Sequence, residues 1–142
     1  MTTEENKAIV RRYVEAHAAN DQAALKEVLA PDPVAHRASS TDSLNREALL
    51  QGISMFSAAF SDRQFTMEDQ IAEGDKVMTR YTWRGTHSGD FQGLPPTGKQ
   101  VAISAFFVQR IKEGKIVEFW HLFDQMALMQ QLGLVPPPQP TR

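Results

Sequence analysis

The stretch Gly114-Lys115-Ile116-Val117-Glu118-Phe119-Trp120-His121-Leu122-Phe123-Asp124 decides how this chain can fold. It predicts a turn that leads into an aromatic-rich strand, and the strand ends at Asp124. Four apolar residues then recur at helical spacing before Gly133: Met126, Leu128, Met129 and Leu132. They predict a short amphipathic helix, so Asp124 stands where a strand becomes a helix. A carboxyl group beside so much apolar surface should be hard to ionise, which makes Asp124 a candidate for proton transfer.

The N-terminal part of the chain carries the apolar spacing of three helices. The first begins at Thr3 and is broken at Asn20-Asp21, which also caps the second. The second helix ends at Pro31-Asp32-Pro33, and residues 33–37 could form a short strand. Asn45 caps the third helix, which extends through Phe60. These helices leave the rest of the chain to build the sheet.

Beyond the third helix the period of the apolar residues becomes that of strands. Residues 65–71 and 77–83 alternate on either side of the hairpin signal Glu73-Gly74-Asp75-Lys76. Residues 101–111 predict another long strand, and the turn-rich segment 85–98 before it predicts a lid or rim. Helices followed by an antiparallel meander give an α+β order. We expect the helices to fill the concave face of a curved sheet incompletely, which leaves an apolar cone that can bind a small molecule.

Composition excludes several classes of protein. The 142 residues fit one domain, and a net charge of −2 without a long basic run gives little support for nucleic-acid binding. The chain has no cysteine, which excludes disulfides and thiolate metal sites. No apolar run approaches the roughly 20 residues that span a bilayer, and the polar N-terminus does not resemble a secretory signal. A cytoplasmic protein is therefore the default expectation.

Five motifs of this chain occur together in one known family: Ala30–His36, Ala72–Val77, Gly85–Lys99, Gly114–Trp120 with Asp124, and Gln131–Gly133. The chain resembles the SnoaL-like polyketide cyclases, which share the fold of nuclear transport factor 2. The resemblance implies a cone-shaped, curved antiparallel sheet wrapped around N-terminal helices. It implies a single α+β barrel domain over residues 1–135, followed by a proline-rich tail over 136–142.

The resemblance also implies a chemistry. In these cyclases an aspartate near the end of the last strand acts as acid and base in an intramolecular aldol ring closure, without a metal or cofactor, and Asp124 matches that position. The other interpretation is that Asp124 caps the closing helix, a common use of aspartate at such a junction. Both roles can hold at once.

Two further candidates follow from the resemblance and from strand geometry. His36 matches a histidine that the family often carries near the pocket, where it would orient a substrate oxygen or share a proton with Asp124; the alternative is a surface histidine. Alternate residues of a strand share one face, so Trp120 should line the cavity if Asp124 does. The same alternation places His121 outside the pocket.

Polar residues on other elements could complete a substrate site. Tyr13 could donate a hydrogen bond to a substrate carbonyl or could simply be an amphipathic core residue. Arg80 would need an anionic partner if it were buried, and Asp124 or Glu118 could supply one. A position facing solvent or a dimer interface is an equal alternative for Arg80.

The remaining candidates depend on strand parity and on the loop. Phe107 or Phe106 should line the cavity, according to which of them points inward. His87 fixes the geometry of the following loop, sits at the rim or contacts the substrate. His17 lies on the apolar stripe of the first helix, and the scattered histidines give no metal-ligand spacing.

Two functions remain open on these observations. One is a cofactor-free acid/base enzyme, a cyclase, isomerase or lyase of the dehydratase type, that acts on a small apolar carbonyl compound. The other is a non-catalytic module that binds a small ligand in the same cone. Either would form a homodimer packed sheet to sheet, with Phe119, His121 and Phe123 as the exposed aromatic surface.

Overall fold

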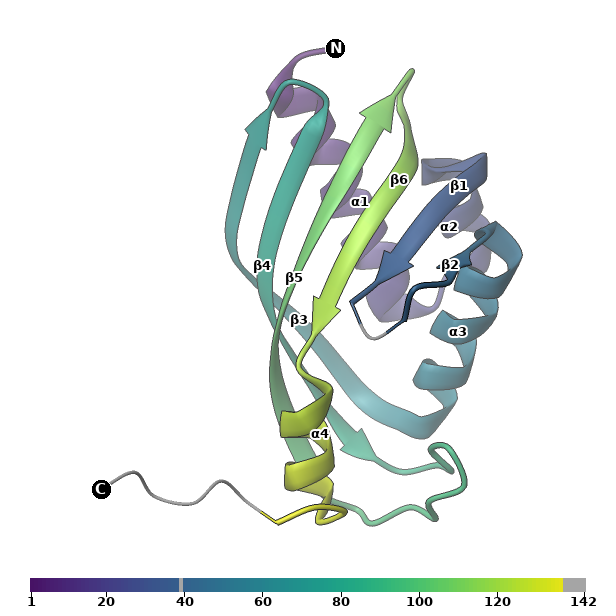
Figure 1. Ribbon diagram of the computed structural model, residues 1–142, viewed down its shortest axis with the longest axis vertical. Coiled ribbons are helices and arrows are strands. Elements are labelled where there is room, and N and C mark those ends of the chain that lie inside the picture. Colours follow the sequence, from purple (N-terminus) through teal and green to yellow (C-terminus); the bar gives the residue numbers. More distant parts are fainter. Residues whose placement is uncertain (39, 137–142) are drawn as a thin grey trace.

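In the residues that the structure describes, 1–38 and 40–136, four helices and one six-stranded sheet make up the fold (Figure 1). This is a computed structural model. The helices are α1 (Thr3–Ala19), α2 (Gln22–Val28), α3 (Arg46–Ala59) and α4 (Gln125–Leu132). The strands are β1 (Leu29–Arg37), β2 (Ser43–Leu44), β3 (Phe60–Glu73), β4 (Lys76–His87), β5 (Gln100–Lys112) and β6 (Lys115–Phe123). The predicted α+β class is confirmed.

Each helix begins at a short polar side chain that caps it. The Thr2 hydroxyl accepts a hydrogen bond from the backbone N–H three residues later at 3.1 Å. The side chains of Asp21, Asn45 and Asp124 do the same at 3.1, 2.9 and 3.0 Å. Such caps satisfy N–H groups that have no partner inside the helix, which is why these residues set the helix starts.

The sheet has the strand order β2-β1-β6-β5-β4-β3. The pairs from β6 to β3 are antiparallel, as expected for the predicted meander. The pair β1–β2, which was not predicted, is also antiparallel. β1 instead pairs with β6 in parallel. This pairing places Arg37 beside His121 and His36 beside Trp120.

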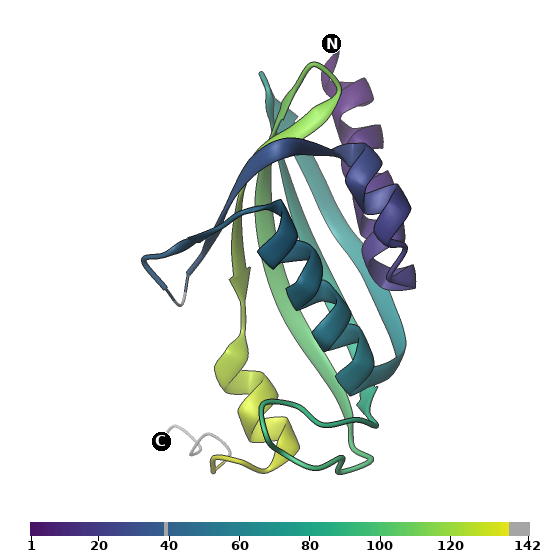
Figure 2. The same ribbon diagram turned by 90° about the vertical axis from the view of Figure 1, so that its right-hand side faces the viewer.

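The helices α1, α2 and α3 lie on one side of the curved sheet (Figure 2). Strand alternation sends opposite side chains to the two faces. Tyr81 and Trp83 of β4 and Phe107 of β5 point toward the helices and are almost fully buried. Arg80 and Phe106 point to the outer face, where Phe106 is 42% exposed. The inward member of the Phe106–Phe107 pair is therefore Phe107.

The face assigned to β6 from the sequence is wrong. Phe119, His121 and Phe123 face the helices, whereas Trp120 points to the outer face and Leu122, 57% exposed, lies at its edge. The prediction extended the alternation of the strand to the acid at position 124. The strand ends one residue earlier, and the acid turns away to cap α4, so it carries no information about the strand faces.

The helices fill the concave face only in part. Apolar residues of α1 and α3 pack against the inner face of the sheet: Ile9, Val10, Val14, Leu49, Leu50 and Ile53. Between these two rows a cavity remains against the inner face of the sheet, which confirms the predicted apolar cone.

The predicted division into a domain over 1–135 and a tail stays a prediction. All of the tail except Pro136 lies outside the described residues. Within the described part of the chain, no helix is both long enough and apolar enough to cross a membrane.

Two glycines provide a test of the packing at α3. A Cβ atom at Gly89 would lie 2.3 Å from the carbonyl oxygen of Ala58, so Gly89→Ala should lower the free energy of unfolding. We expect a loss of roughly 1–3 kcal/mol, the usual cost of overpacking. Gly52 lies within α3 with open space around it, so Gly52→Ala should raise the free energy of unfolding by about 0.5–1 kcal/mol. Thermal and urea unfolding measure both, and a Gly89→Ala protein as stable as the wild type would contradict the close approach.

Candidate functional site

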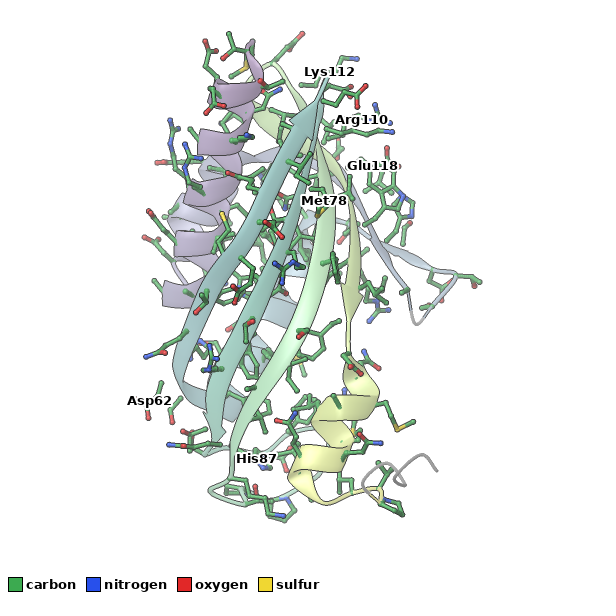
Figure 3. The ribbon with its side chains drawn as sticks, turned by 90° about the vertical axis from the view of Figure 1, so that its left-hand side faces the viewer. Asp62, Met78, His87, Arg110, Lys112 and Glu118 are labelled. Atoms are coloured by element: carbon green, nitrogen blue, oxygen red, sulfur yellow. The ribbon has the colours of Figure 1, made fainter. Side chains whose placement is uncertain are left out.

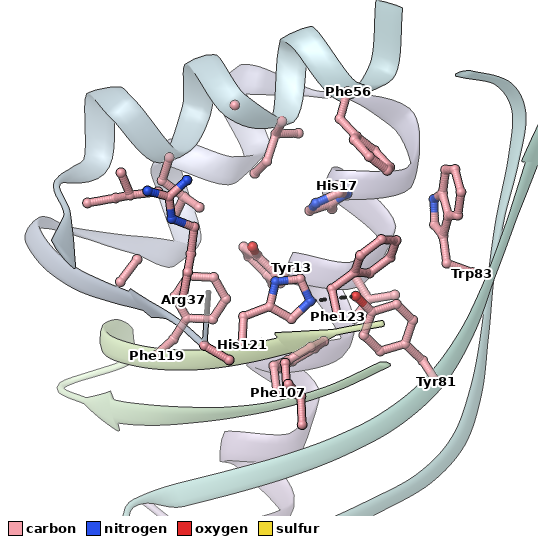
Figure 4. Close-up of a pocket in the computed structure, with 18 of the residues that line it drawn as sticks. Tyr13, His17, Arg37, Phe56, Tyr81, Trp83, Phe107, Phe119, His121 and Phe123 are labelled. Atoms are coloured by element: carbon pink, nitrogen blue, oxygen red, sulfur yellow. Dashed lines mark hydrogen bonds between the residues drawn. The ribbon is translucent and has the colours of Figure 1, made fainter. Parts of the chain in front are cut away.

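A cavity of about 490 Å³ lies between α1, α3 and the inner face of the sheet (Figure 4). Its wall is mainly aromatic: Tyr13, Phe56, Phe65, Tyr81, Trp83, Phe107, Phe119 and Phe123. Many of these rings meet edge to face, with centroids 5.8–6.4 Å apart, and Phe56 lies tilted against Trp83 at 4.9 Å. Such contacts hold the rings in fixed orientations. The volume is typical of a site for a small molecule.

The mouth of the cavity is marked by lining residues that solvent also reaches: Arg37, Ala38, Gln92, Leu122 and Gln125. They come from the end of β1, from the loop between β4 and β5, and from the junction of β6 with α4. The loop between β4 and β5 therefore contributes to the rim, as its turn-rich sequence indicated.

One hydrogen-bonded pair lies inside the aromatic wall. The Tyr81 hydroxyl and Nε2 of His121 are 2.8 Å apart (Figure 4). The His121 ring also stacks on Phe119, with ring centroids 6.0 Å apart. Among the described residues, no hydrogen bond is made by Nδ1 of His121, which leaves that nitrogen available to a ligand.

Burial sets the charge of these groups. It lowers the pKa of His121 to about 4. Burial also lowers the pKa of His17 to about 3, and the nearby His121 and Arg63 contribute to this shift in the same direction. The pKa values of the Tyr13 and Tyr81 hydroxyls are raised well above their ordinary value, again by burial. At neutral pH both histidines are therefore neutral and both tyrosines are protonated.

Two buried nitrogens in the wall have no hydrogen-bond partner in the described part of the chain. They are Nδ1 of His17, on α1, and Nε1 of Trp83, on β4. A buried polar atom without a partner costs about 1–3 kcal/mol, so such atoms usually meet water or a ligand. Both atoms are covered by their neighbours, so they weaken the wall of the cavity without presenting a contact at its surface.

Asp124 does not lie in the cavity. Its side chain is exposed and caps α4 by accepting a hydrogen bond from Ala127 N at 3.0 Å. The predicted position inside the cone is wrong, and the alternative interpretation as a helix cap is the one observed. Its carboxylate is therefore not among the groups that line the cone.

His36 and Trp120 also lie outside the cavity, on the outer face. Their rings stack with centroids 5.5 Å apart, and Nε2 of His36 lies 2.8 Å from Oε2 of Glu118. Arg110 contacts the same glutamate (Figure 3). The expectation that Trp120 lines the pocket is wrong, because it followed from the inverted face of β6. The expectation for His36, which the family resemblance implied, is wrong because His36 is the register partner of Trp120 and shares its outward face.

Arg80 and His87 have structural partners away from the cavity. Nη2 of Arg80 lies 2.6 Å from the Asp69 carboxylate on the outer face, so the predicted pairing with Asp124 or Glu118 is wrong. His87 is completely buried, and its Nδ1 accepts a hydrogen bond from Thr97 N at 3.2 Å. His87 therefore fixes the loop that follows β4 and does not line the cavity.

Tyr13 and Phe107 line the cavity, as expected. His121, predicted to lie outside the pocket, lines it instead, and the lining residues Tyr81 and His17 were not predicted. One signal for His121 was available: the alternate set of β6 contains a glutamate that would be costly to bury, so the aromatic set should point inward.

No group of three or more His, Cys, Asp or Glu residues within the described residues could hold a metal ion. The cavity also carries no carboxylate among its described lining residues. The polar groups of its described lining side chains are imidazole, phenol, indole, guanidinium and the amides of Gln92 and Gln125.

Solved structures of similar shape include several related proteins. AclR from Streptomyces galilaeus, to which a hydroxylase activity is attributed, is 28% identical with a TM-score of 0.89, over 97% of this chain and 87% of that chain. IdmH from Streptomyces antibioticus, to which a polyketide cyclase activity is attributed, is 33% identical with a TM-score of 0.81, over 90% of this chain and 98% of that chain. A SnoaL-like protein from Jannaschia sp. CCS1 is 20% identical with a TM-score of 0.85, over 96% and 95% of the two chains, and supports the fold alone.

Sequence comparisons give a consistent assignment. A comparison with curated protein sequences gives no match. The family model described as SnoaL-like polyketide cyclase matches residues 7–132, which is most of the chain. The curved sheet, the helices on its concave face and this match agree, and the chain belongs to the SnoaL-like polyketide cyclase family.

Proposed function

We propose that this protein is a cofactor-independent acid/base enzyme that moves a proton at a carbon next to a carbonyl group. Its substrate is a small, largely apolar carbonyl compound, and the reaction is an aldol ring closure or a related isomerisation or dehydration. The observation that carries the proposal is the neutral His121, hydrogen-bonded to Tyr81 inside an aromatic cavity. General acid–base catalysis needs a positioned side chain that can take up and return a proton, and an imidazole can do both.

The geometry supports a simple sequence of proton transfers. Nε2–H of His121 donates to the Tyr81 oxygen, which leaves Nδ1 with the lone pair of a base. Nδ1 takes the proton from carbon, and the C–H electron pair moves into the enolate. The Tyr81 hydroxyl hydrogen is then free to stabilise the enolate oxygen. The enolate carbon attacks a second carbonyl, and the protonated imidazole returns its proton to the new alkoxide.

The opposite wall supplies groups for the second carbonyl. Tyr13 and His17 come from α1, and their rings contact each other with centroids 5.9 Å apart. Because burial keeps the Tyr13 hydroxyl protonated, it can donate a hydrogen bond to a carbonyl oxygen. We assign Tyr13 to orienting the substrate and His17 to the polar contact beside it.

A second candidate function is binding without catalysis. It is favoured by the low pKa of His121, because a weak base abstracts a proton less readily. It is disfavoured by the hydrogen-bonded pair of His121 and Tyr81, which a purely apolar ligand would not use.

We also propose a homodimer, formed by the outer faces of two sheets. The residues expected to build it, Phe119, His121 and Phe123, line the cavity instead and are not available. The outer face presents other apolar side chains: Val34 is 40%, Phe106 42% and Leu122 57% exposed, next to Trp120. Exposed apolar patches of this kind commonly mark interfaces.

Deuterium exchange into a small cyclic ketone tests the enzyme proposal without knowledge of the substrate. The protein should accelerate exchange at the carbon beside the carbonyl of 2-tetralone in D₂O, followed by NMR. His121→Gln should lower this rate by about 10²–10⁴-fold, the usual contribution of a positioned base, and Tyr81→Phe by less.

The controls are His36→Gln, on the outer face, and Asp124→Asn, which keeps a capping oxygen; both should exchange at the wild-type rate. Full exchange by His121→Gln would contradict the assigned role of His121. Ketone binding without acceleration by the wild type would favour the binding module.

The neutral histidines predict a pH dependence of stability. Each has a lower pKa when folded than when unfolded, so the unfolded state binds more protons and stability falls as the pH drops. The loss should begin near the ordinary value of 6.5 and continue to about 4 for His121 and about 3 for His17. For His121 it should reach about 3 kcal/mol. Melting temperatures measured against pH should fall less steeply for His121→Gln and His17→Gln, and slopes equal to that of the wild type would contradict the buried neutral state.

Sedimentation tests the dimer. Phe106→Glu should convert the dimer to a monomer, because a charge would be buried at the interface. The fold should tolerate the change, since Arg80 is the cross-strand neighbour of this position. Met55→Glu, at a residue of α3 that is 65% exposed, is the matched control and should remain dimeric. A wild-type monomer at micromolar concentration would contradict the proposal.

A further inference from the structure

Arg37 is the one described lining residue of the cavity whose side chain carries a formal charge at neutral pH. We propose that this guanidinium binds a carboxylate group of the ligand, so that the substrate is a carbonyl compound with an apolar, ring-sized body and one carboxylate. The inference rests on the proposed function, because it takes the cavity to be the substrate site.

The fold places Arg37 at the mouth beside the proposed base. Arg37 is the last residue of β1 and the parallel register partner of His121. Neighbouring strands lie about 4.8 Å apart, and paired residues point to the same face. The backbone is held there by a hydrogen bond of 3.1 Å from Ala38 N to the carbonyl oxygen of His121. The backbone of Arg37 is therefore fixed next to that of His121, and the Arg37 side chain extends along the cavity (Figure 4).

Arg37 differs from the arginines that have structural partners. Arg80 is paired with Asp69, and Arg110 contacts Asp75 and Glu118. In the described part of the chain, no carboxylate pairs with Arg37. Glu118, the acid of β6, is hydrogen-bonded to the neighbouring residue His36 on the other face of the sheet. A cation that faces the cavity without an internal partner is left for an anion that enters the cavity.

The position of the charge also suits an amphiphilic ligand. At the solvent-exposed mouth, the guanidinium keeps its hydration when the cavity is empty, so it costs little. A carboxylate can meet its planar fork with two parallel hydrogen bonds, which are among the stronger polar contacts in proteins. The aromatic wall beyond it then receives the apolar body, with the carbonyl groups at the depth of His121 and Tyr81.

Calorimetric titration with a matched pair of ligands tests the inference, using naphthalene-2-carboxylate and naphthalene-2-carboxamide at neutral pH and low salt. The wild type should bind the carboxylate at least about tenfold more tightly than the amide, as expected for a charge-assisted pair. Arg37→Gln should reduce this preference to about one and leave the affinity for the amide unchanged, which shows that the cavity is intact. Arg37→Lys should keep part of the preference, because it retains the charge without the fork.

Arg84→Gln is the matched control. Arg84 is exposed on the outer face of β4, and its loss changes the net charge equally, so this variant should keep the full preference. Equal affinities for the two ligands in the wild type, no binding of the carboxylate, or a preference that survives in Arg37→Gln would each overturn the inference. Because the titration involves no turnover, it gives its answer even if the ketone exchange fails. If Arg37→Gln lost the ketone deuterium exchange but kept the preference for the carboxylate, Arg37 would act in catalysis, and carboxylate recognition would be overturned.

Discussion

The two-residue period of β6 is the constraint on which the site depends. It sends Phe119, His121 and Phe123 into the cone and leaves Trp120 outside. A slip of one residue would exchange the two sets and put an imidazole on the outer face. The register is held from both sides, because β5 and β1 each pair with β6. They place Phe107 and Arg37 beside His121. The register of β6 therefore sets the positions of the aromatic wall, the proposed base and the charged mouth of the cavity.

Polar groups in an aromatic cavity weaken the fold unless something pairs with them. The hydrogen bond between Tyr81 and His121 offsets part of this cost. Nδ1 of His17 and Nε1 of Trp83 remain without partners in the described chain, at about 1–3 kcal/mol each. A core of leucine and phenylalanine would avoid this loss and would also fill the cone. The protein therefore loses stability by keeping these polar side chains in the wall of the cavity.

Local signals in the sequence were sufficient for the fold and insufficient for the site. The caps Asp21 and Asn45 and the hairpin at Gly74 each act over three or four residues, so their pattern could be read directly. The site joins residues far apart in the chain, since His121 meets Tyr81 from another strand and Arg37 through a parallel pairing. The strand face was inverted because an acid that caps a helix was counted as part of the strand.

The electrostatics of the cavity explain how a histidine with a low pKa could still act as a base. A low pKa keeps the imidazole unprotonated at neutral pH but makes it weak in the resting state. During proton abstraction an imidazolium forms next to an enolate, and opposite charges attract strongly where water is excluded. No carboxylate among the described lining residues competes for that imidazolium. The negative charge that would strengthen His121 thus arises on the substrate itself, and only as the proton is transferred, which is the condition for stabilising the transition state more than the ground state.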